Sequence, residues 1–256
     1  MGPADRGASN CGATSGSKRR LVIIPAYQEA DTVRSVVSAA RKALPGCDVV
    51  VVDDGSLDAT ASEARAAGAI VLRHPANLGY GAALQTGYKY AVRMGYEVVA
   101  QMDADGQHDP SSLRPLLAPI ENAEVDMALG SRTLSQVRYH LPLARRVGMR
   151  IFSALVCAAT GMRVTDPTSG FQAMSAAVAK FLATDVFPSD YADADVLILL
   201  KRAGFRILEV PVVMHPAPGG RSMHRGLRPL YYVFRMLLSI LVETIRRAPR
   251  PGGGKA

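Results

Sequence analysis

The chain has 256 residues, enough for one large α/β domain or two small ones, and 48% of them are hydrophobic and 20% charged, which is an ordinary globular composition. Its formal net charge of +8 predicts an anionic partner such as a phosphorylated substrate, an acidic membrane surface or nucleic acid. Aromatic residues make up only 6% of the chain and do not alternate with the basic ones, so we expect no nucleic-acid partner.

The ends of the chain and its cysteines indicate a cytoplasmic protein. Residues 1–18 are rich in Gly, Ala and Ser without an apolar core, so we expect a disordered tail and not a signal peptide. The widely spaced Cys11, Cys47 and Cys157 fit neither a disulfide framework nor a metal site. No run reaches the roughly 18–20 apolar residues of a membrane span. We expect a cytoplasmic protein, with a peripheral position on the cytoplasmic membrane face as an open alternative.

Apolar runs alternate with helical patterns in the first half of the chain. The predicted strands are Leu21–Pro25, Val49–Asp53, Ile70–Arg73, Val98–Asp103 and Met127–Ser131. The predicted helices between them are Asp31–Ala43, Ala59–Ala67, Gly81–Met94 and Ser111–Ile120. Continuously apolar strands indicate burial on both faces, hence a doubly wound, mostly parallel sheet flanked by helices. Ligands are expected at the carboxyl ends of such strands.

The second half is predicted to complete the same globule, because it contains no internal repeat and no clear linker. Its predicted elements are the helix Pro142–Thr160, the strand Phe171–Ser175, the helix Asp193–Ala203 and the strand Ile207–Met214. Residues 226–247 then form an amphipathic pattern with a basic side. This last helix is predicted to pack on its own domain or on a dimer partner, or to dock on a membrane surface or a membrane protein. Residues 248–256 are expected to form a second disordered tail.

Carboxylates follow the predicted strands where a glycine-rich nucleotide fingerprint would otherwise stand. Neither G-x-G-x-x-G nor G-x-x-x-x-G-K-[ST] is found, which disfavours Rossmann cofactor binding and P-loop phosphate binding. Asp103 and Asp105 are two residues apart, so an extended segment would point both side chains the same way, and Gln107 would continue that face. These oxygens suit Mg²⁺ or Mn²⁺ bridging a diphosphate. A pair of this kind also caps turns and helices, so the motif alone leaves both functions open.

A second acidic turn follows Val49–Asp53. Asp53 is a candidate acceptor of hydrogen bonds from a nucleobase or ribose. Asp58 precedes the predicted helix that begins at Ala59, so an N-cap is its favoured role.

Six motifs are found in one order along the chain, namely Pro25–Glu29, Asp53–Asp58, Asn77–Gly79, Asp103–Pro110, Gly130–Arg132 and Asp166–Phe171. Together they resemble the inverting family 2 glycosyltransferases with the GT-A fold, and within them the branch similar to dolichyl- or polyprenyl-phosphate mannose synthases. The resemblance extends over residues 20–224. It implies a GT-A glycosyltransferase domain over residues 19–225 and a hexosyltransferase activity.

The resemblance also implies roles for individual residues. The implied donor-binding residues are Pro25, Tyr27, Glu29, Asp53, Asp103, Ala104, Asp105, Gln107, Arg221 and Ser222. The implied metal ligands are Asp103, Asp105 and Gln107, and the implied acceptor-binding residues are Arg132, Arg146 and Ser169. Asp166 would line the sugar and acceptor side as a candidate catalytic residue.

Three departures from the family pattern concern the donor side. Gln28 stands where the family usually has Asn, and Leu57 where it usually has Thr. The loop containing Arg221 and Ser222 lacks the lysine that often follows the serine, so the resemblance leaves open which contacts this loop makes with the diphosphate.

The nature of the acceptor decides whether a general base is required. A hydroxyl acceptor needs one, and Asp195 or Asp193 is the candidate, although either is equally explained as a first-turn helix acid. A lipid phosphate is already ionised and needs only arginines to position it. The stretch from Arg132 to Arg163 contains no acid and favours the lipid phosphate, although solvated surface arginines would give the same pattern.

The sequence therefore predicts a metal-dependent hexosyltransferase that uses a UDP- or GDP-hexose, Mg²⁺ or Mn²⁺, and polyprenyl phosphate as the favoured acceptor. Transfer to a saccharide or small-molecule hydroxyl is the first alternative. A non-catalytic sugar-nucleotide-binding protein is the second, and the intact Asp103 and Asp105 pair disfavours it. A nucleotidyltransferase is the third, and it would need a Gly-rich loop where Pro25–Tyr27 stands.

Overall fold

The computed structural model describes residues 18–135, 143–185, 187, 194–216 and 238. The predicted tails 1–18 and 248–256 and the predicted helix 226–247 therefore lie outside the described residues, except for Lys18 and Leu238. None of the helices in the described part is long and apolar enough to cross a membrane.

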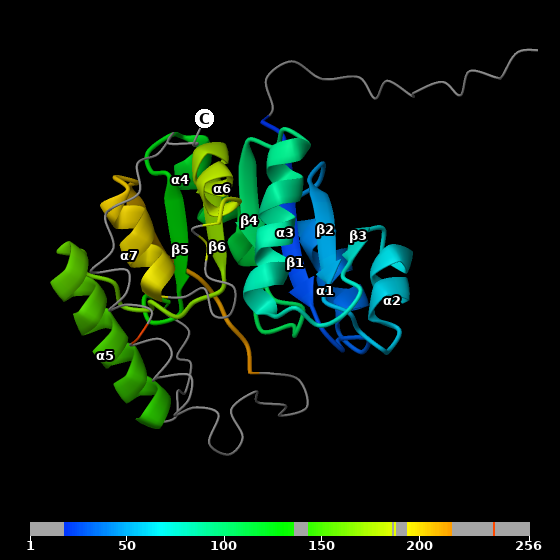
Figure 1. Cartoon of the computed structure of the whole chain (residues 1–256), viewed down its shortest axis with the longest axis horizontal. Coiled ribbons are helices and arrows are strands. Elements are labelled where there is room, and N and C mark those ends of the chain that lie inside the picture. Colours follow the sequence, from blue (N-terminus) through cyan, green and yellow to red (C-terminus); the bar gives the residue numbers. More distant parts are fainter. Residues whose placement is uncertain (1–17, 136–142, 186, 188–193, 217–237, 239–256) are drawn as a thin grey trace, which may run out of the picture.

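Seven strands form one sheet in the order β3-β2-β1-β4-β6-β5-β7. They are β1 (Arg20–Ala26), β2 (Asp48–Asp53), β3 (Ile70–Arg73), β4 (Val98–Gln101), β5 (Met127–Ser131), β6 (Gln172–Ser175) and β7 (Ile207–Pro211). All neighbouring strands are parallel except β6, which is antiparallel to β4 and β5. The prediction of a mostly parallel sheet flanked by helices is confirmed (Figure 1).

Helices cover both faces of this sheet (Figure 1). They are α1 (Val33–Ala43), α2 (Thr60–Ala66), α3 (Tyr80–Arg93), α4 (Leu113–Glu121), α5 (Leu143–Thr160), α6 (Ala176–Leu182) and α7 (Ala194–Arg202), with a 3-10 turn η1 (Pro110–Ser112) before α4. α1 buries Val33, Val36, Val37 and Ala40, a stripe at helical spacing that explains why this segment is a helix against the sheet.

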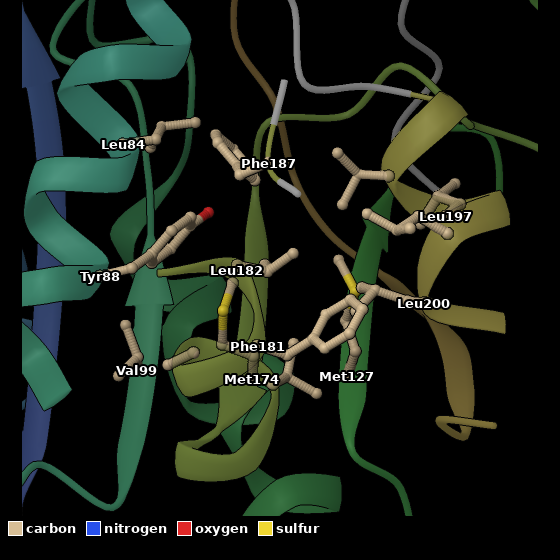
Figure 2. Close-up of a cluster of buried hydrophobic side chains, with 14 of the residues drawn as sticks. Leu84, Tyr88, Val99, Met127, Met174, Phe181, Leu182, Phe187, Leu197 and Leu200 are labelled. Carbon is tan, nitrogen blue, oxygen red and sulfur yellow. The ribbon is translucent and has the colours of Figure 1, made fainter. Parts of the chain in front are cut away.

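The sheet separates two hydrophobic clusters. One lies between the sheet and α3, α5, α6 and α7, where Tyr88 of α3 meets Phe187 edge-on with ring centroids 5.4 Å apart (Figure 2). The other lies beneath α1, α2 and α4. Residues Val49 to Asp53 of β2 are all buried, as expected of a strand covered on both faces.

The structure differs from the predicted elements at two strand ends, in one additional helix and in the direction of one strand. β4 ends at Gln101 and not at Asp103, and β7 ends at Pro211 and not at Met214. The short helix α6 was not predicted. The antiparallel direction of β6 was not predicted either; it arises because the chain enters β6 through Gly170, which lies against Asp103 just beyond the end of β4.

Candidate active site

The polar turns that follow β1, β2 and β4 meet at one edge of the sheet. β1 pairs with both β2 and β4, and Ala26 lies opposite Asp53 in the register. The Asp54 amide donates to the Ala26 carbonyl at 2.9 Å, and the Gln28 amide donates to the Ser56 hydroxyl at 2.9 Å. The loops after the first two strands are thereby joined, as expected at the carboxyl ends of parallel strands.

The acidic residues Asp103 and Asp105 lie in a tight turn and not in an extended segment. Gly106 has a φ of 77°, and Asp105 accepts hydrogen bonds from the Gln107 amide at 2.9 Å and from Gln107 Nε2 at 2.6 Å. The expectation that extended geometry aligns these side chains is wrong, because β4 has already ended. The turn brings the carboxylates close enough for the charge of Asp103 to raise the pKa of Asp105.

Asp103 is held from two sides. The Tyr80 hydroxyl donates to its Oδ1 at 3.0 Å, and its own amide donates to His108 Nδ1 at 3.0 Å. His108 is buried and stacked on Phe171, with ring centroids 4.7 Å apart. Burial, with a smaller contribution from Arg132, lowers the pKa of His108 to about 4, so the ring is neutral near pH 7. Since Nδ1 accepts a hydrogen bond, the proton is on Nε2, 3.6 Å from Asp103 Oδ2.

The acidic turn fits a divalent cation. Burial raises the pKa of Asp103, and burial followed by the charge of Asp103 raises that of Asp105. Carboxylates with raised pKa values are short of compensating positive charge, which a metal ion would supply. In the described part of the chain, no three His, Cys, Asp or Glu side chains converge as a complete metal cage. Two carboxylates are nonetheless the number that Mg²⁺ commonly takes together with substrate phosphates.

Across the acidic turn, Arg132 and Asp166 form a buried ion pair. Arg132 Nε lies 2.5 Å from Asp166 Oδ2 and Nη2 lies 3.0 Å from Oδ1, while the Arg132 amide also donates to Oδ2 at 3.1 Å. The Arg132 side chain is 5% exposed and that of Asp166 is fully buried. Glu209 of β7 accepts from the amides of Thr165 and Asp166 at 2.9 Å. Both Asp166 oxygens are thus occupied by Arg132, a geometry for positioning that arginine and not for exchanging a proton with a substrate.

Asp53 is buried at the end of β2. Its side chain has no exposed surface, and it accepts from the Ser56 amide at 3.0 Å and lies 3.1 Å from Arg73 Nε. The direct contact of Asp53 with a base or ribose stays a prediction. Asp58 caps the start of α2 as predicted: its carboxylate accepts from the Thr60 amide at 3.0 Å, although the N-cap position itself is held by Ala59, which makes no side-chain capping bond.

The other donor-side residues differ in accessibility. Pro25 and Ala104 are buried, Glu29 is partly buried, and Tyr27 is 43% exposed. The Glu29 amide donates to the Thr60 hydroxyl at 2.8 Å. Among these predicted donor-side residues, Tyr27 therefore offers the largest exposed fraction to a ligand.

The remaining predicted residues are spread over the second half. Ser169 is buried beside Gly170, and Arg146 is exposed on α5. Asp195 is buried in the first turn of α7, where its Oδ1 accepts from the Val196 amide at 2.9 Å, an arrangement that agrees with a first-turn helix acid. Asp193, Arg221 and Ser222 lie outside the described residues.

The chain after β7 returns along the acidic turn before it reaches residue 217. The His215 amide donates to the Gln107 carbonyl at 2.7 Å, and the Asp109 amide donates to the Val213 carbonyl at 3.2 Å. The loop with Arg221 and Ser222 thus begins beside the acidic turn.

Several site residues were not selected from the sequence, namely Asp54, His74, Tyr80, His108 and Glu209. His108 and Asp54 stand next to residues of the acidic motifs, so their position was a usable signal. Tyr80 immediately precedes the predicted helix Gly81–Met94, and Glu209 lies inside the predicted strand Ile207–Met214; neither position carries a distinguishing pattern.

The family model of glycosyl transferase family 2 matches residues 21–181. The chain belongs to glycosyltransferase family 2. The acidic turn, the Arg132–Asp166 pair and the joined loops after β1 and β2 are thus the candidate active site of a family 2 glycosyltransferase.

Relatives of this family 2 chain extend over most of its length. An undecaprenyl-phosphate mannosyltransferase from Micrococcus luteus is 32% identical over 81% of the chain and 88% of the relative. A polyprenol monophosphomannose synthase from Mycolicibacterium smegmatis is 32% identical over 88% of both proteins. An uncharacterized protein of Methanocaldococcus jannaschii is 34% identical over 88% of the chain and 92% of the relative.

Solved structures of similar fold include glucosyl-3-phosphoglycerate synthase from Mycobacterium tuberculosis in complex with Mn²⁺ and UDP-glucose. It has a TM-score of 0.66 and 22% identity over 93% of this chain and 81% of that protein. At this identity, the likeness establishes the family 2 fold and no more.

Proposed function

We propose that this glycosyltransferase moves a hexose, with mannose as the first sugar to test, from a nucleoside diphosphate sugar to the phosphate of a polyprenyl phosphate. The observation that carries the donor half of this proposal is the pair of partly buried carboxylates, Asp103 and Asp105, in the turn after β4, where their pKa values are raised. The acceptor half is supported by relatives that are named for undecaprenyl phosphate and polyprenol.

The donor diphosphate is proposed to bind at Asp103 and Asp105 through Mg²⁺ or Mn²⁺. A divalent cation there would neutralise the charge that develops on the departing nucleoside diphosphate. Gln107 donates its amide to Asp105, so its proposed part is to orient that carboxylate, while its amide oxygen is the atom that could reach the metal. Tyr27 has an exposed ring, against which the nucleotide is proposed to lie. Arg221 and Ser222 are proposed to close over the diphosphate from the loop that starts beside Gln107.

Transfer to a phosphate requires no general base. An ionised phosphate oxygen forms the bond to the anomeric carbon, the bond from that carbon to the diphosphate breaks, and the electron pair leaves with the nucleoside diphosphate. Attack from the face opposite the leaving group would invert the anomeric configuration. Asp166 is therefore proposed to position Arg132 and not to act as the base, which agrees with its bidentate pairing.

The surface beyond Arg132 is consistent with a lipid acceptor. α5 exposes Val147 and Ile151, each close to half exposed, beside the exposed Arg146 and Arg150. Apolar side chains flanked by arginines suit the interface of an anionic membrane. We propose that this surface, together with the basic pattern of residues 226–247 beyond the 19–225 transferase domain, brings the site to a membrane face.

The test is a transfer assay with GDP-mannose, UDP-glucose or UDP-N-acetylglucosamine, a short polyprenyl phosphate, and Mn²⁺ or Mg²⁺. We expect a glycosylated lipid phosphate from one donor, and none with chelator or with the matching polyprenol that lacks phosphate. Transfer to the polyprenol, or donor turnover that does not respond to the lipid phosphate, would overturn the acceptor assignment. Turnover that persists in excess chelator would overturn the metal assignment.

A further inference from the structure

Tyr80 contacts the acidic turn from a different element. It is the first residue of α3, it is partly buried, and its hydroxyl donates to Asp103 Oδ1 at 3.0 Å. The Asn77–Gly79 motif stops one residue before it. The contact joins α3 to a residue that we propose as a metal ligand.

The turn that precedes α3 determines where the Tyr80 hydroxyl lies. Gly79 has a φ of 101°, and the amides of Leu78 and Gly79 both donate to Asp54 at 2.9 Å. The buried Asp54 also lies 2.7 Å from His74 Nδ1, and His74 Nε2 lies 2.9 Å from the Thr86 hydroxyl one and a half turns into α3. The start of α3 is thus tied to the end of β2, and Tyr80 has little freedom to turn away from Asp103.

Little space remains around the contact. A Cβ atom on Gly170 would lie 3.0 Å from the Tyr80 hydroxyl and 3.2 Å and 3.4 Å from the two carboxylate oxygens of Asp103. On another side, the Asp103 amide donates to the neutral His108. The Gly170 backbone and the Tyr80 hydroxyl therefore bound the carboxylate on one side, while the Asp103 side chain remains 31% exposed.

We infer that Tyr80 is a positioning residue for the metal site. The Tyr80 hydroxyl donates to Oδ1 of Asp103 and thereby fixes the orientation of the carboxylate before a cation binds. Metal binding then does not have to restrict the rotation of this side chain. Groups that hydrogen-bond to a metal ligand commonly change metal affinity by about 10- to 100-fold when removed. This inference rests on the proposed function, because Asp103 is a metal ligand only there.

The test is Tyr80→Phe, with Tyr90→Phe as the matched control. Both tyrosines belong to α3 and pack against the same hydrophobic cluster, and both changes remove one hydroxyl. Free Mn²⁺ is followed by electron paramagnetic resonance in a titration without any sugar donor, and the thermal midpoint of the metal-free protein is recorded in parallel. We expect Tyr80→Phe to weaken Mn²⁺ binding about tenfold with a nearly unchanged midpoint, and Tyr90→Phe to retain wild-type affinity.

Gly170→Ala gives an independent second variant, because its added methyl group displaces Asp103 or Tyr80 without removing a polar atom. We expect it to weaken Mn²⁺ binding as well. Wild-type affinity in Tyr80→Phe would overturn the positioning role and leave the metal site intact. If the wild-type protein itself bound no Mn²⁺, the metal site and the inference would both be wrong.

Discussion

The donor side and the acceptor side of the candidate site differ in whether their charged side chains have a partner of opposite charge. On the donor side, Asp103 and Asp105 share a turn; burial raises the pKa of both, and the charge of Asp103 raises that of Asp105 further. On the acceptor side, Arg132 and Asp166 neutralise one another in a bidentate pair that is almost completely buried. The first arrangement is short of a cation, and the second is complete without a ligand.

This difference distinguishes side chains that would bind a ligand from side chains that hold another side chain in position. A carboxylate pair without compensating charge gains from a bound metal, whereas a satisfied ion pair gains little from a further partner. Because Asp166 already matches the charge of Arg132, we expect an acceptor phosphate to draw much of its positive field from elsewhere. Arg146, exposed on α5, is the candidate.

The largest effect is expected from breaking the acceptor-side pair. Asp166→Ala leaves Arg132 buried without its partner, so we expect the free energy of unfolding to fall by about 3–5 kcal/mol. The double variant Arg132→Met/Asp166→Leu should regain most of that stability in urea unfolding while transferase activity stays lost. If the double variant stayed as unstable as Asp166→Ala, the pair would matter through packing and not through charge.

Removing a donor-side carboxylate should instead affect activity and spare the fold. Asp105→Ala removes a proposed metal ligand, and we expect turnover to fall by about 10²–10³-fold, measured as lipid-linked hexose formed per minute. Asp48→Ala is the control, because Asp48 is an exposed aspartate at the opposite end of β2. An active Asp105→Ala protein would contradict the donor-side assignment.

The pH dependence of the stabilisation of the protein by Mn²⁺ tests whether the donor-side carboxylates lack a compensating charge. Asp103 and Asp105 have pKa values raised above the ordinary 3.8, so in the metal-free protein the stability they contribute is present below pH 4 and is lost as the pH rises through their folded pKa values. Mn²⁺ binds the ionised form, so its stabilising effect should grow over that window by about 1.4 kcal/mol per pH unit for each proton released.

Thermal unfolding with and without Mn²⁺ from pH 4 upward measures this effect. Asp105→Asn should flatten the curve and make the metal-free protein more stable than the wild type near pH 7. A Mn²⁺ effect that does not change with pH would show that these carboxylates are ionised before the metal arrives.

The sequence predicted the alternation of elements because buried parallel strands are continuously apolar, as in Val49–Val52. It also located the acidic turn and the arginine at the end of β5. It did not predict the direction of β6, which depends on the edge from which the chain re-enters the sheet. The residues of β6, Gln172–Ser175, carry no mark of that direction.

The sequence was a poorer guide to the interaction partners of the charged side chains. Asp53 was assigned to a nucleotide because it ends a strand, and its place in the sequence did not show that its carboxylate also faces Ser56 and Arg73. Arg132 was assigned to an acceptor, and its pairing with Asp166, 34 residues away, depends on β5 and the 165–166 loop meeting in space. Residue type and order therefore located the site, while the fold decided which charges remain available in it.

The smallest expected effect concerns backbone strain in the donor loop. Gln28 has a φ of 57°, as does Ala123 at the end of α4, a left-handed conformation that is unfavourable for most residues and best tolerated by Gly and Asn. The family preference for Asn at position 28 thus has a backbone reason, since the Gln28 amide must still reach Ser56.

We expect Gln28→Asn to raise the free energy of unfolding by about 0.5–1 kcal/mol, with turnover within about twofold of wild type because the exposed side chain is not needed. Ala123→Gly is the control and should raise the free energy of unfolding by a similar amount far from the site. If Ala123→Gly were stabilised and Gln28→Asn were not, the Gln28 side chain itself would have a function on the donor side of the site.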